Sequence, residues 1–195
     1  MKYKTSNCKL NTHFGNFDFY CFNYGECEND NVLVLKSEII SNKPNLRIQS
    51  ACFTSEIFRS KDCDCHEQLE KSLELINTHG GLLIYLLQDG RGAGIFQKIK
   101  GMRLTQEEGI NTAQAYDKLK IKRDPRDYER VVNALNYFEI KKVNLLTNNP
   151  RKVSGLTDRG IEVNRIPLEI EPTTDSVEYL KSKKSELGHL FNRYL

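Results

Sequence analysis

The chain has 195 residues, of which 38% are hydrophobic and 28% charged, and it carries a formal net charge of +3 at pH 7. This length suits a single domain over residues 1–195, and since no apolar run reaches the roughly 18 residues of a membrane span, we expect no membrane partner. The charge is too small and too dispersed for a nucleic-acid partner, and the N-terminus lacks the apolar stretch of a secretory signal, so a cytoplasmic location is expected.

The first part of the chain is predicted to be rich in β-strands. Three segments share an enrichment in aromatic and β-branched residues, and they span residues 16–22, 32–39 and 46–53. A helix is then predicted from His66 to the glycine pair at 80 and 81, because apolar residues recur there at helical spacing. An uninterrupted apolar run at 82–88 predicts a buried strand, and the glycine-rich loop 89–94 follows at its end.

The second part of the chain alternates between helices and strands. Residues 95–119 are mostly helical by pattern, and Pro125 fits the first turn of a helix that runs to about Phe138. The remaining elements are predicted as strand, helix, strand and terminal helix over residues 143–149, 150–159, 161–168 and 176–194. This order predicts a mixed α+β fold class.

The spacing of three cysteines predicts a metal site. Cys52 is followed after ten residues by Cys63 and Cys65, and a predicted helix begins directly beyond them. Structural zinc sites are usually closed by four protein ligands, whereas catalytic sites hold three and leave one position for water. Zinc lowers the pKa of such a water to about 7, which supplies a nucleophile at neutral pH. The spacing therefore predicts a catalytic zinc site for hydrolysis.

Two alternatives compete with this interpretation. The three cysteines are buried apolar residues in one, and in the other the site is structural with a fourth protein ligand. His66 is a poor fourth ligand because it adjoins Cys65 at a helix start and would have to fold back, so an exposed histidine is expected. The other cysteines are expected to lie in strands as part of the core, and they are Cys8, Cys21 and Cys27.

The loop 89–94 (DGRGAG) is suited to an anion. Its glycines allow backbone N–H groups to approach a phosphate, and Arg91 can bind phosphate in a bidentate manner. A triphosphate would fit, although the same letters also form plain turns and the lysine of a nucleotide-binding P-loop is missing. Further donors are available from residues that are individually common at surfaces and caps, namely Arg47, Thr112, Thr147 and Lys152.

Five segments of the chain resemble motifs of the GTP cyclohydrolase II family. CDCHEQL (63–69) resembles C-D-C-G-x-Q-L, and LLTNNPRK (145–152) matches L-L-T-N-N-P-x-K. The other three occur in the same order and span residues 47–54, 88–94 and 124–128. Residues 181–190 resemble the closing segment of the family, so the similarity covers nearly the whole chain.

The resemblance implies a GTP cyclohydrolase II-like fold, with an antiparallel N-terminal part followed by an α/β core, and a homodimer. It implies one zinc ion per chain on Cys52, Cys63 and Cys65, and attack of activated water on C8 of the guanine. GTP or a related purine nucleotide would carry Mg²⁺ on its triphosphate. The residues expected to bind the nucleotide are Arg47, Ser50, Gln68, Asp89, Gly90, Arg91, Thr112, Thr147 and Lys152.

The segment RDPRDYER contains two residues to which the resemblance gives chemical roles. By pattern alone it is equally typical of a solvated, charged helix start. The resemblance makes Asp124 the proton acceptor. It makes Arg126 the group that attacks the α-phosphorus, with release of pyrophosphate.

The chain departs from the family near the predicted chemistry. Ala51 replaces a glutamate, His66 a glycine and Asp89 a glutamate, and residues 111–116 differ beyond their threonine. These changes are compatible with another purine triphosphate as substrate.

Met102 occupies the place of a tyrosine that the family uses near the ring being hydrolysed. A thioether is only a weak acceptor and cannot donate a proton to the second hydrolysis, which removes formate. We therefore predict a reaction that stops at the formylamino-pyrimidine and pyrophosphate, unless Tyr116 or Tyr85 replaces the missing hydroxyl. The alternatives are a complete GTP cyclohydrolase II serving riboflavin synthesis and a non-catalytic nucleotide-binding relative.

Overall fold

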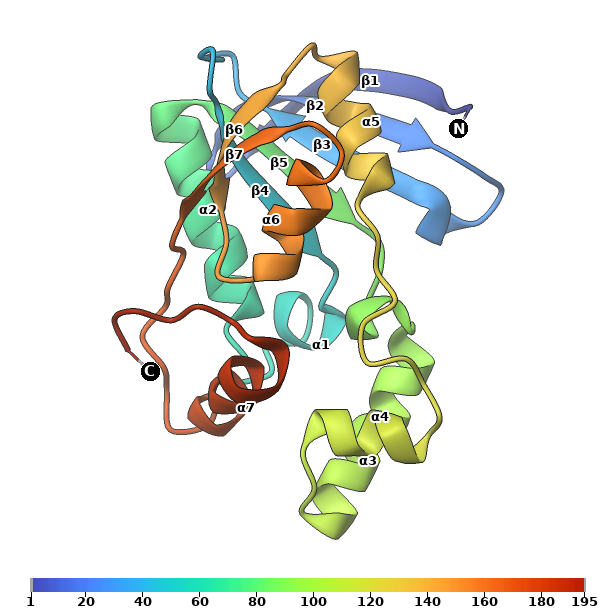
Figure 1. Cartoon of the computed structure of the whole chain (residues 1–195). Coiled ribbons are helices and arrows are strands. Elements are labelled where there is room, and N and C mark those ends of the chain that lie inside the picture. Colours follow the sequence, from blue (N-terminus) through green and yellow to red (C-terminus); the bar gives the residue numbers. More distant parts are fainter. Residues whose placement is uncertain (1, 195) are drawn as a thin grey trace.

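A computed structural model describes residues 2–194, and its centre is one mixed sheet (Figure 1). The seven strands lie in the order β1-β2-β3-β5-β4-β6-β7. They are β1 (Lys4–Thr12), β2 (Gly15–Asn23), β3 (Asn31–Lys36), β4 (Asn45–Ser50), β5 (Gly81–Leu86), β6 (Lys142–Leu146) and β7 (Glu162–Ile166). The helices are α1 (Phe53–Glu56), α2 (Cys65–His79), α3 (Ile95–Glu108), α4 (Thr112–Lys118), α5 (Glu129–Tyr137), α6 (Pro150–Thr157) and α7 (Val177–Leu187), with 3₁₀ turns η1 (Glu28–Asp30) and η2 (Gly90–Gly92).

The sheet has an antiparallel part and a parallel part that meet at β5. Strands β1, β2, β3 and β5 are antiparallel neighbours, while β5, β4, β6 and β7 pair in parallel. Helix α2 connects β4 to β5 and α6 connects β6 to β7, as parallel neighbours require. The predicted mixed α+β class, with an antiparallel first part and an α/β continuation, is confirmed.

Alternation along β5 explains how both faces of the sheet are covered. Leu82, Ile84 and Leu86 point to the face on which residues of α5 and α6 complete the larger core cluster. Leu83 points to the opposite face, where it packs with Leu73 and Ile76 of α2. The buried strand predicted over residues 82–88 is therefore confirmed, although it spans Gly81–Leu86 and ends two residues earlier than predicted.

Several predicted boundaries were wrong, and local backbone chemistry explains each one. The predicted strand 46–53 ends at Ser50, because the chain turns into α1 at Cys52. Pro125 lies outside any helix: the Asp127 side chain accepts from the Glu129 N–H, and α5 begins there. The predicted helix 95–119 is divided at Gly109 (φ 66°), and the predicted terminal helix 176–194 ends at Gly188 (φ 63°), both left-handed.

Strand β1 and four side chains also differ from expectation. Strand β1 was not predicted by itself, and it is an edge strand with mostly exposed side chains. Cys8 on β1 and Cys27 before η1 are exposed and Cys21 is half-buried, so these cysteines are not core residues. His66 is half-buried instead of exposed, because Arg59 and Glu70 both contact its ring.

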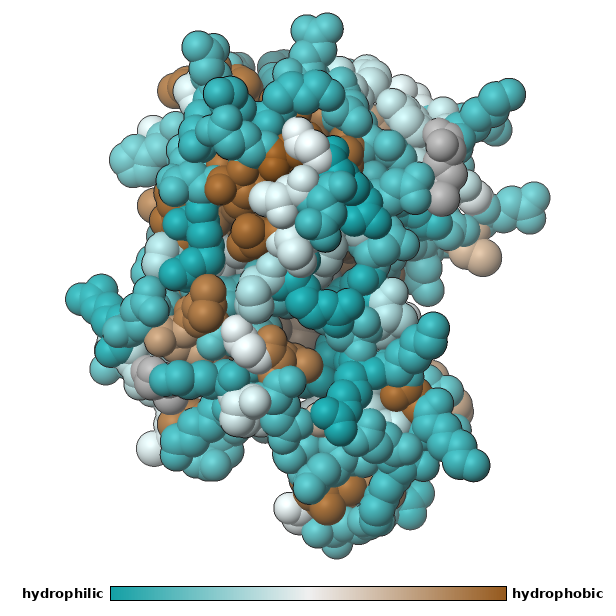
Figure 2. Space-filling model, in the orientation of Figure 1, coloured by the Kyte–Doolittle hydropathy of each residue, from teal (hydrophilic) through white to brown (hydrophobic). Residues whose placement is uncertain are grey.

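No helix within residues 2–194 is both long and apolar enough to cross a membrane. The face drawn in Figure 2 is mostly hydrophilic, and it is hollowed between α7 and the α3–α4 pair. A cavity of about 610 Å³ lies there, lined by residues of α3, α4 and α7.

Candidate active site

The predicted site lies at one edge of the sheet, where three parallel strands end. Cys52 follows β4, Asp89 follows β5 and Thr147 follows β6. The carboxyl ends of parallel strands meet at the same edge, which is the usual place for a ligand in such sheets. Segments far apart in the sequence are therefore brought together here.

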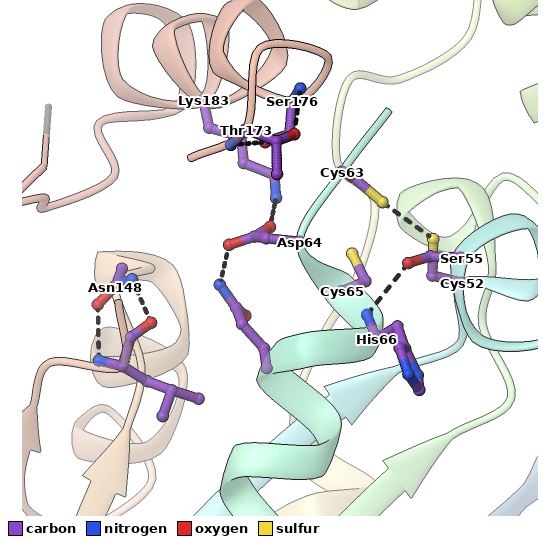
Figure 3. A network of polar contacts seen from close by, with 12 residues as sticks. Cys52, Ser55, Cys63, Asp64, Cys65, His66, Asn148, Thr173, Ser176 and Lys183 are labelled. Atoms are coloured by element: carbon purple, nitrogen blue, oxygen red, sulfur yellow. Dashed lines mark hydrogen bonds and ion pairs between the residues drawn. The ribbon is translucent and has the colours of Figure 1, made fainter. Parts of the chain in front are cut away.

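Three cysteine side chains converge at this edge (Figure 3). Cys52 precedes α1, Cys63 lies in the following loop, and Cys65 is the first residue of α2. Their sulfur atoms all lie within 4.8 Å of one another, and those of Cys52 and Cys63 are 3.7 Å apart. Two thiolates that bind one tetrahedral zinc at about 2.3 Å are about 3.8 Å apart. The donor atoms and their spacing therefore fit a zinc ion.

The thiols influence one another electrostatically. Hydrogen bonds from Cys63 and Cys65, together with the charge of Lys98, lower the pKa of Cys52. The hydrogen bond with Cys52 in turn raises the pKa of Cys63 and of Cys65. Three thiolates cannot accumulate side by side without a compensating charge, and a divalent cation supplies that charge.

Within residues 2–194, no fourth His, Cys, Asp or Glu ligand atom joins the cluster. Among the His, Cys, Asp and Glu side chains of residues 2–194, these three cysteines form the group whose ligand atoms are close enough to share an ion. The His66 ring points away from the sulfur atoms in Figure 3, toward Glu70, while its backbone N–H donates to Ser55 Oγ at 3.1 Å. The arrangement is that of an open site with three protein ligands.

A cavity of about 180 Å³ opens next to Cys52 and Cys65. Six cationic side chains line it, namely Arg47, Arg91, Lys98, Arg126, Lys152 and Lys183, whereas Asp89 is the single carboxylate in the lining. Such an excess of positive charge in a small space suits a polyanion. The predicted residues that line this cavity are Arg47, Ser50, Gln68, Asp89, Gly90, Arg91, Met102, Thr112, Arg126 and Lys152.

The cations differ in how fully the protein already uses their donors. Arg47 makes four hydrogen bonds, to Gln49, Gln68 and the Leu146 carbonyl, and burial lowers its pKa to about 10. Lys152 donates to the Ile48 carbonyl at 2.7 Å, and burial followed by the charge of Arg47 lowers its pKa well below the usual value.

Arg91 is the contrasting case among the cations. Its backbone is left-handed (φ 59°), and its Nη1 is buried with no hydrogen-bond partner among the described residues. A buried donor of this kind is costly unless a ligand satisfies it. Arg91 is therefore the cation best prepared for an incoming phosphate.

Asp124 and Arg126 form a bidentate ion pair. The carboxylate accepts from Arg126 Nε and Nη2, each at 2.7 Å, while Arg151 approaches it at 3.0 Å. Burial alone would raise the pKa of Asp124, but the hydrogen bonds and charges of the arginines lower it. Burial would lower the pKa of Arg126, but Asp124 raises it. Asp124 is thus a carboxylate in contact with a guanidinium, which donates to Ser50 Oγ at 3.2 Å.

Three predicted site residues lie outside the lining of this cavity. Cys63 lines the neighbouring cavity of α3, α4 and α7. Asp124 does not line the cationic cavity itself but contacts Arg126, which does. Thr147 is 1% exposed, and its hydroxyl accepts from the Asn149 N–H at 3.1 Å. Its observed contact shapes the loop after β6.

Lys98 was missed by sequence reasoning. Its ammonium lies 3.3 Å from Cys52 Sγ, 2.8 Å from Thr54 Oγ1 and 2.9 Å from Asp89 Oδ1. The loop 89–94 contains no lysine of its own, but Lys98 in the first turn of α3 contacts Asp89 of this loop. A search for basic residues one turn beyond the loop would have found it. Three further lining residues were also missed: Tyr179 and Lys183 of α7, and His189, two residues beyond its end.

The tyrosines expected to compensate for Met102 are otherwise engaged. Tyr116 donates to the Gly90 carbonyl at 3.1 Å, and Tyr85 donates to the Glu56 carboxylate. Met102 lines both cavities, and Tyr179 lines the same two. Tyr116 lines only the first of these cavities, whereas Tyr179 lines both together with Met102.

This α+β protein thus carries a thiol cluster that fits zinc beside a cationic cavity at the edge of its mixed sheet, an arrangement suited to a metal ion and an anion. The sequence pattern described as GTP cyclohydrolase II matches residues 3–167, and the chain belongs to that family. The family assignment is confirmed.

Curated relatives agree with the family assignment. The riboflavin biosynthesis protein RibBA of Staphylococcus epidermidis is 44% identical over 183 residues, or 93% of this chain and 46% of the relative. RibBA of Staphylococcus saprophyticus is 41% identical with the same coverage. The chain spans less than half the length of these relatives. Among solved structures, RibBX, a two-domain 3,4-dihydroxy-2-butanone 4-phosphate synthase from A. baumannii, matches 87% of this chain and 40% of that one, with 13% identity and a TM-score of 0.48.

Proposed function

We propose that this protein opens the imidazole ring of GTP at C8 by zinc-dependent hydrolysis, releases pyrophosphate and stops at the formylamino-pyrimidine. The observation that carries the proposal is the open group of three thiols beside the cationic cavity. A zinc ion held by Cys52, Cys63 and Cys65 would supply Lewis acidity and an activated water at neutral pH. The family and its riboflavin-related curated members support GTP as the purine nucleotide.

The cavity's charge supports binding of a triphosphate. The unpartnered Nη1 of Arg91 can donate to a phosphate oxygen, and arginine forks match that geometry. The ammonium of Lys98 adds positive charge to the same cavity. Asp89 already accepts from the Phe53 N–H and from Lys98. Mg²⁺ is therefore proposed to arrive on the triphosphate, held mainly by phosphate oxygens.

The Asp124–Arg126 pair supports pyrophosphate release at the same site. In its ion-paired form Arg126 is a cation suited to stabilise charge on the α-phosphate. Attack by Arg126 on phosphorus requires loss of a proton from its guanidinium, and Asp124 contacts two of the three nitrogens that carry such protons, Nε and Nη2. The pKa directions of the pair favour the ionic form, so this transfer is the demanding step of the proposed roles.

The proposal that the product keeps its formyl group depends on Met102, which has no hydroxyl to donate a proton. A single incubation of zinc-loaded protein with GTP and Mg²⁺, followed by mass spectrometry with formate and pyrophosphate assays, tests the proposal. We expect pyrophosphate and the formylamino product in equal amounts and little formate. Met102→Tyr should add formate release, while Met102→Leu is the matched control without a hydroxyl. Stoichiometric formate from the unaltered protein would refute the truncated reaction, and unchanged GTP would refute the activity.

A complete GTP cyclohydrolase II reaction is the second candidate, because Tyr179 lines the same cavities as Met102. If Tyr179 supplies the missing hydroxyl, formate is released by the unaltered chain and lost in Tyr179→Phe. The two candidates therefore give opposite formate results.

We also propose a homodimer located in the cytoplasm. Large apolar side chains on α3 and at the end of α1 support an association surface: Phe58 is 77% and Phe96 66% exposed. Light scattering on the purified chain measures the assembly directly.

A further inference from the structure

The segment after residue 167 contributes to the site, although the family match ends there. Helix α7, red in Figure 1, lies beside the loop that carries the cysteines. Lys183 of α7 is 9% exposed and reaches Asp64, whose Oδ1 is 3.1 Å from its ammonium. The side chains of the pair are 11% and 4% exposed, so water screens their attraction only weakly.

Asp64 stands between two of the three cysteines in the sequence. Its second carboxylate oxygen accepts from Gln68 Nε2 at 2.5 Å, so α7 and α2 hold the same side chain (Figure 3). Asp64 is the N-cap residue of α2 and so lies in the turn that precedes this helix. The directions of the Cys63 and Cys65 side chains depend on that turn.

Independently of this ion pair, a local cap orders the start of α7 and a hydrogen bond beyond its end ties it to the loop after β6. Before its first turn, the Thr173 and Ser176 side chains accept from each other's backbone N–H groups at 3.2 and 3.0 Å. Beyond its end, the Leu190 N–H donates to the Asn148 carbonyl at 2.8 Å. The Asn148 side chain in turn holds the backbone of Leu168 through two hydrogen bonds. The hydrogen bonds of Leu190 and Asn148 therefore help to hold α7, and with it Lys183, in position near Asp64.

The surroundings of Lys183 favour a positioning role over a role as a mobile phosphate ligand. Its ammonium lies 4.5 Å from the centre of the Tyr179 ring as well as against Asp64. A lysine between a carboxylate and an aromatic face has its charge already compensated. Moving it to a phosphate would leave Asp64 as an uncompensated buried charge, which is costly.

We propose that Lys183 is a positioning residue of the metal centre: through Asp64 it fixes the Cys63–Cys65 turn, so that docking of α7 and metal binding stabilise each other. This inference rests on the proposed zinc site. The coupling is reciprocal, because two events that favour the same arrangement must strengthen each other by the same factor.

Zinc affinity, measured by competition with a chromophoric chelator, tests the inference without reference to catalysis. Lys183→Met should weaken zinc binding about 10- to 100-fold, the usual effect of losing a group that orients a metal ligand. Lys183→Arg should recover most of the affinity, because a guanidinium can also reach the carboxylate. Lys181→Met is the matched control, since Lys181 lies on the same helix in an exposed pair with Glu178.

The outcomes separate the inference from the proposed function. If the unaltered chain binds no zinc, the proposed function fails. If it binds zinc and folded Lys183→Met, checked by circular dichroism, binds it equally well, the inference fails. A raised KM for GTP at unchanged zinc affinity would likewise refute the inference and assign Lys183 to substrate binding.

Hydrogen exchange of the unaltered chain provides a test that does not depend on a variant folding. Removal of zinc with a chelator should speed amide exchange in α7, while exchange in β1 and β2 stays unchanged. Equal exchange in α7 with and without zinc would contradict the coupling. In a double-mutant cycle, Asp64→Asn and Lys183→Met should have less than additive effects on zinc affinity, and additive effects would also contradict it.

Discussion

The antiparallel and parallel parts of the sheet carry similar side chains but use them differently. Every residue that lines the cationic cavity comes from Arg47 or later in the chain. The antiparallel strands also hold cysteines and an aspartate between two cations: Asp18 contacts Lys9 and Lys36, as Asp124 contacts Arg126 and Arg151. Residue types alone therefore do not make a site. The side chains must also converge and be buried, as they do at the ends of the parallel strands.

The largest expected contrast concerns the cysteines. Cys63→Ser should remove most bound zinc and lower turnover of GTP by more than about 100-fold, because serine is a poor zinc ligand. Cys8→Ser, in the exposed edge strand, should change neither quantity. Elemental analysis and a pyrophosphate assay measure both. Full zinc occupancy in Cys63→Ser would contradict the ligand assignment.

The paired aspartates give the next contrast. Asp124→Asn should lower turnover by about 100- to 10,000-fold, as expected for loss of an acid–base group, while zinc content stays at the level of the unaltered chain. Asp18→Asn removes an aspartate that likewise contacts two cations, in the antiparallel part of the sheet, and should leave turnover unchanged. Similar losses in both variants would remove the distinction between the two regions.

The smallest expected effect is a dependence of stability on pH through His189. Burial, followed by the charges of Lys183 and Lys152, lowers the pKa of His189 to about 3. Below about pH 6.5 the histidine is protonated in the unfolded chain but stays neutral in the folded chain. The contribution of His189 to the free energy of unfolding is therefore fully present above pH 6.5 and declines toward pH 3. The decline is at most about 1.4 kcal/mol per pH unit.

Urea unfolding at pH 7, 6 and 5 measures this dependence. His189→Gln should flatten the curve, whereas His13→Gln, in the exposed turn between β1 and β2, should not. An identical slope in all three chains would assign the pH dependence to other groups.

The sequence predicted those features that depend on local pattern. Alternation and apolar runs located most strands, and cysteine spacing located the thiol cluster, because a short loop and a helix start bring Cys63 and Cys65 back to Cys52. Strand β1 was not recognised because its polar, exposed side chains carry no strong periodic signal. Its partner β2, with Phe17 and Phe22 buried, was recognised.

What could not be predicted depends on tertiary docking. The ammonium of Lys98 is at the thiols only because α3 returns its first turn to the end of β5, and Lys183 is 119 positions from Asp64. A sequence pattern also does not reveal which hydrogen-bond donors of a side chain are already bonded within the folded protein. Arg47 and Arg91 are both arginines near the cavity, yet Arg47 is bonded within the protein and Arg91 keeps a buried nitrogen without a partner among the described residues.

The position of α7 has a practical consequence for handling the protein. Strand β1 is the outermost strand, and β2, β3 and β5 separate it from β4, which leads into Cys52, so an affinity tag or fluorescent fusion placed before β1 would be remote from the metal centre. A tag attached after α7 would instead pull on the helix that contacts Asp64. Preparations that differ only in which end carries the tag should therefore differ in metal content.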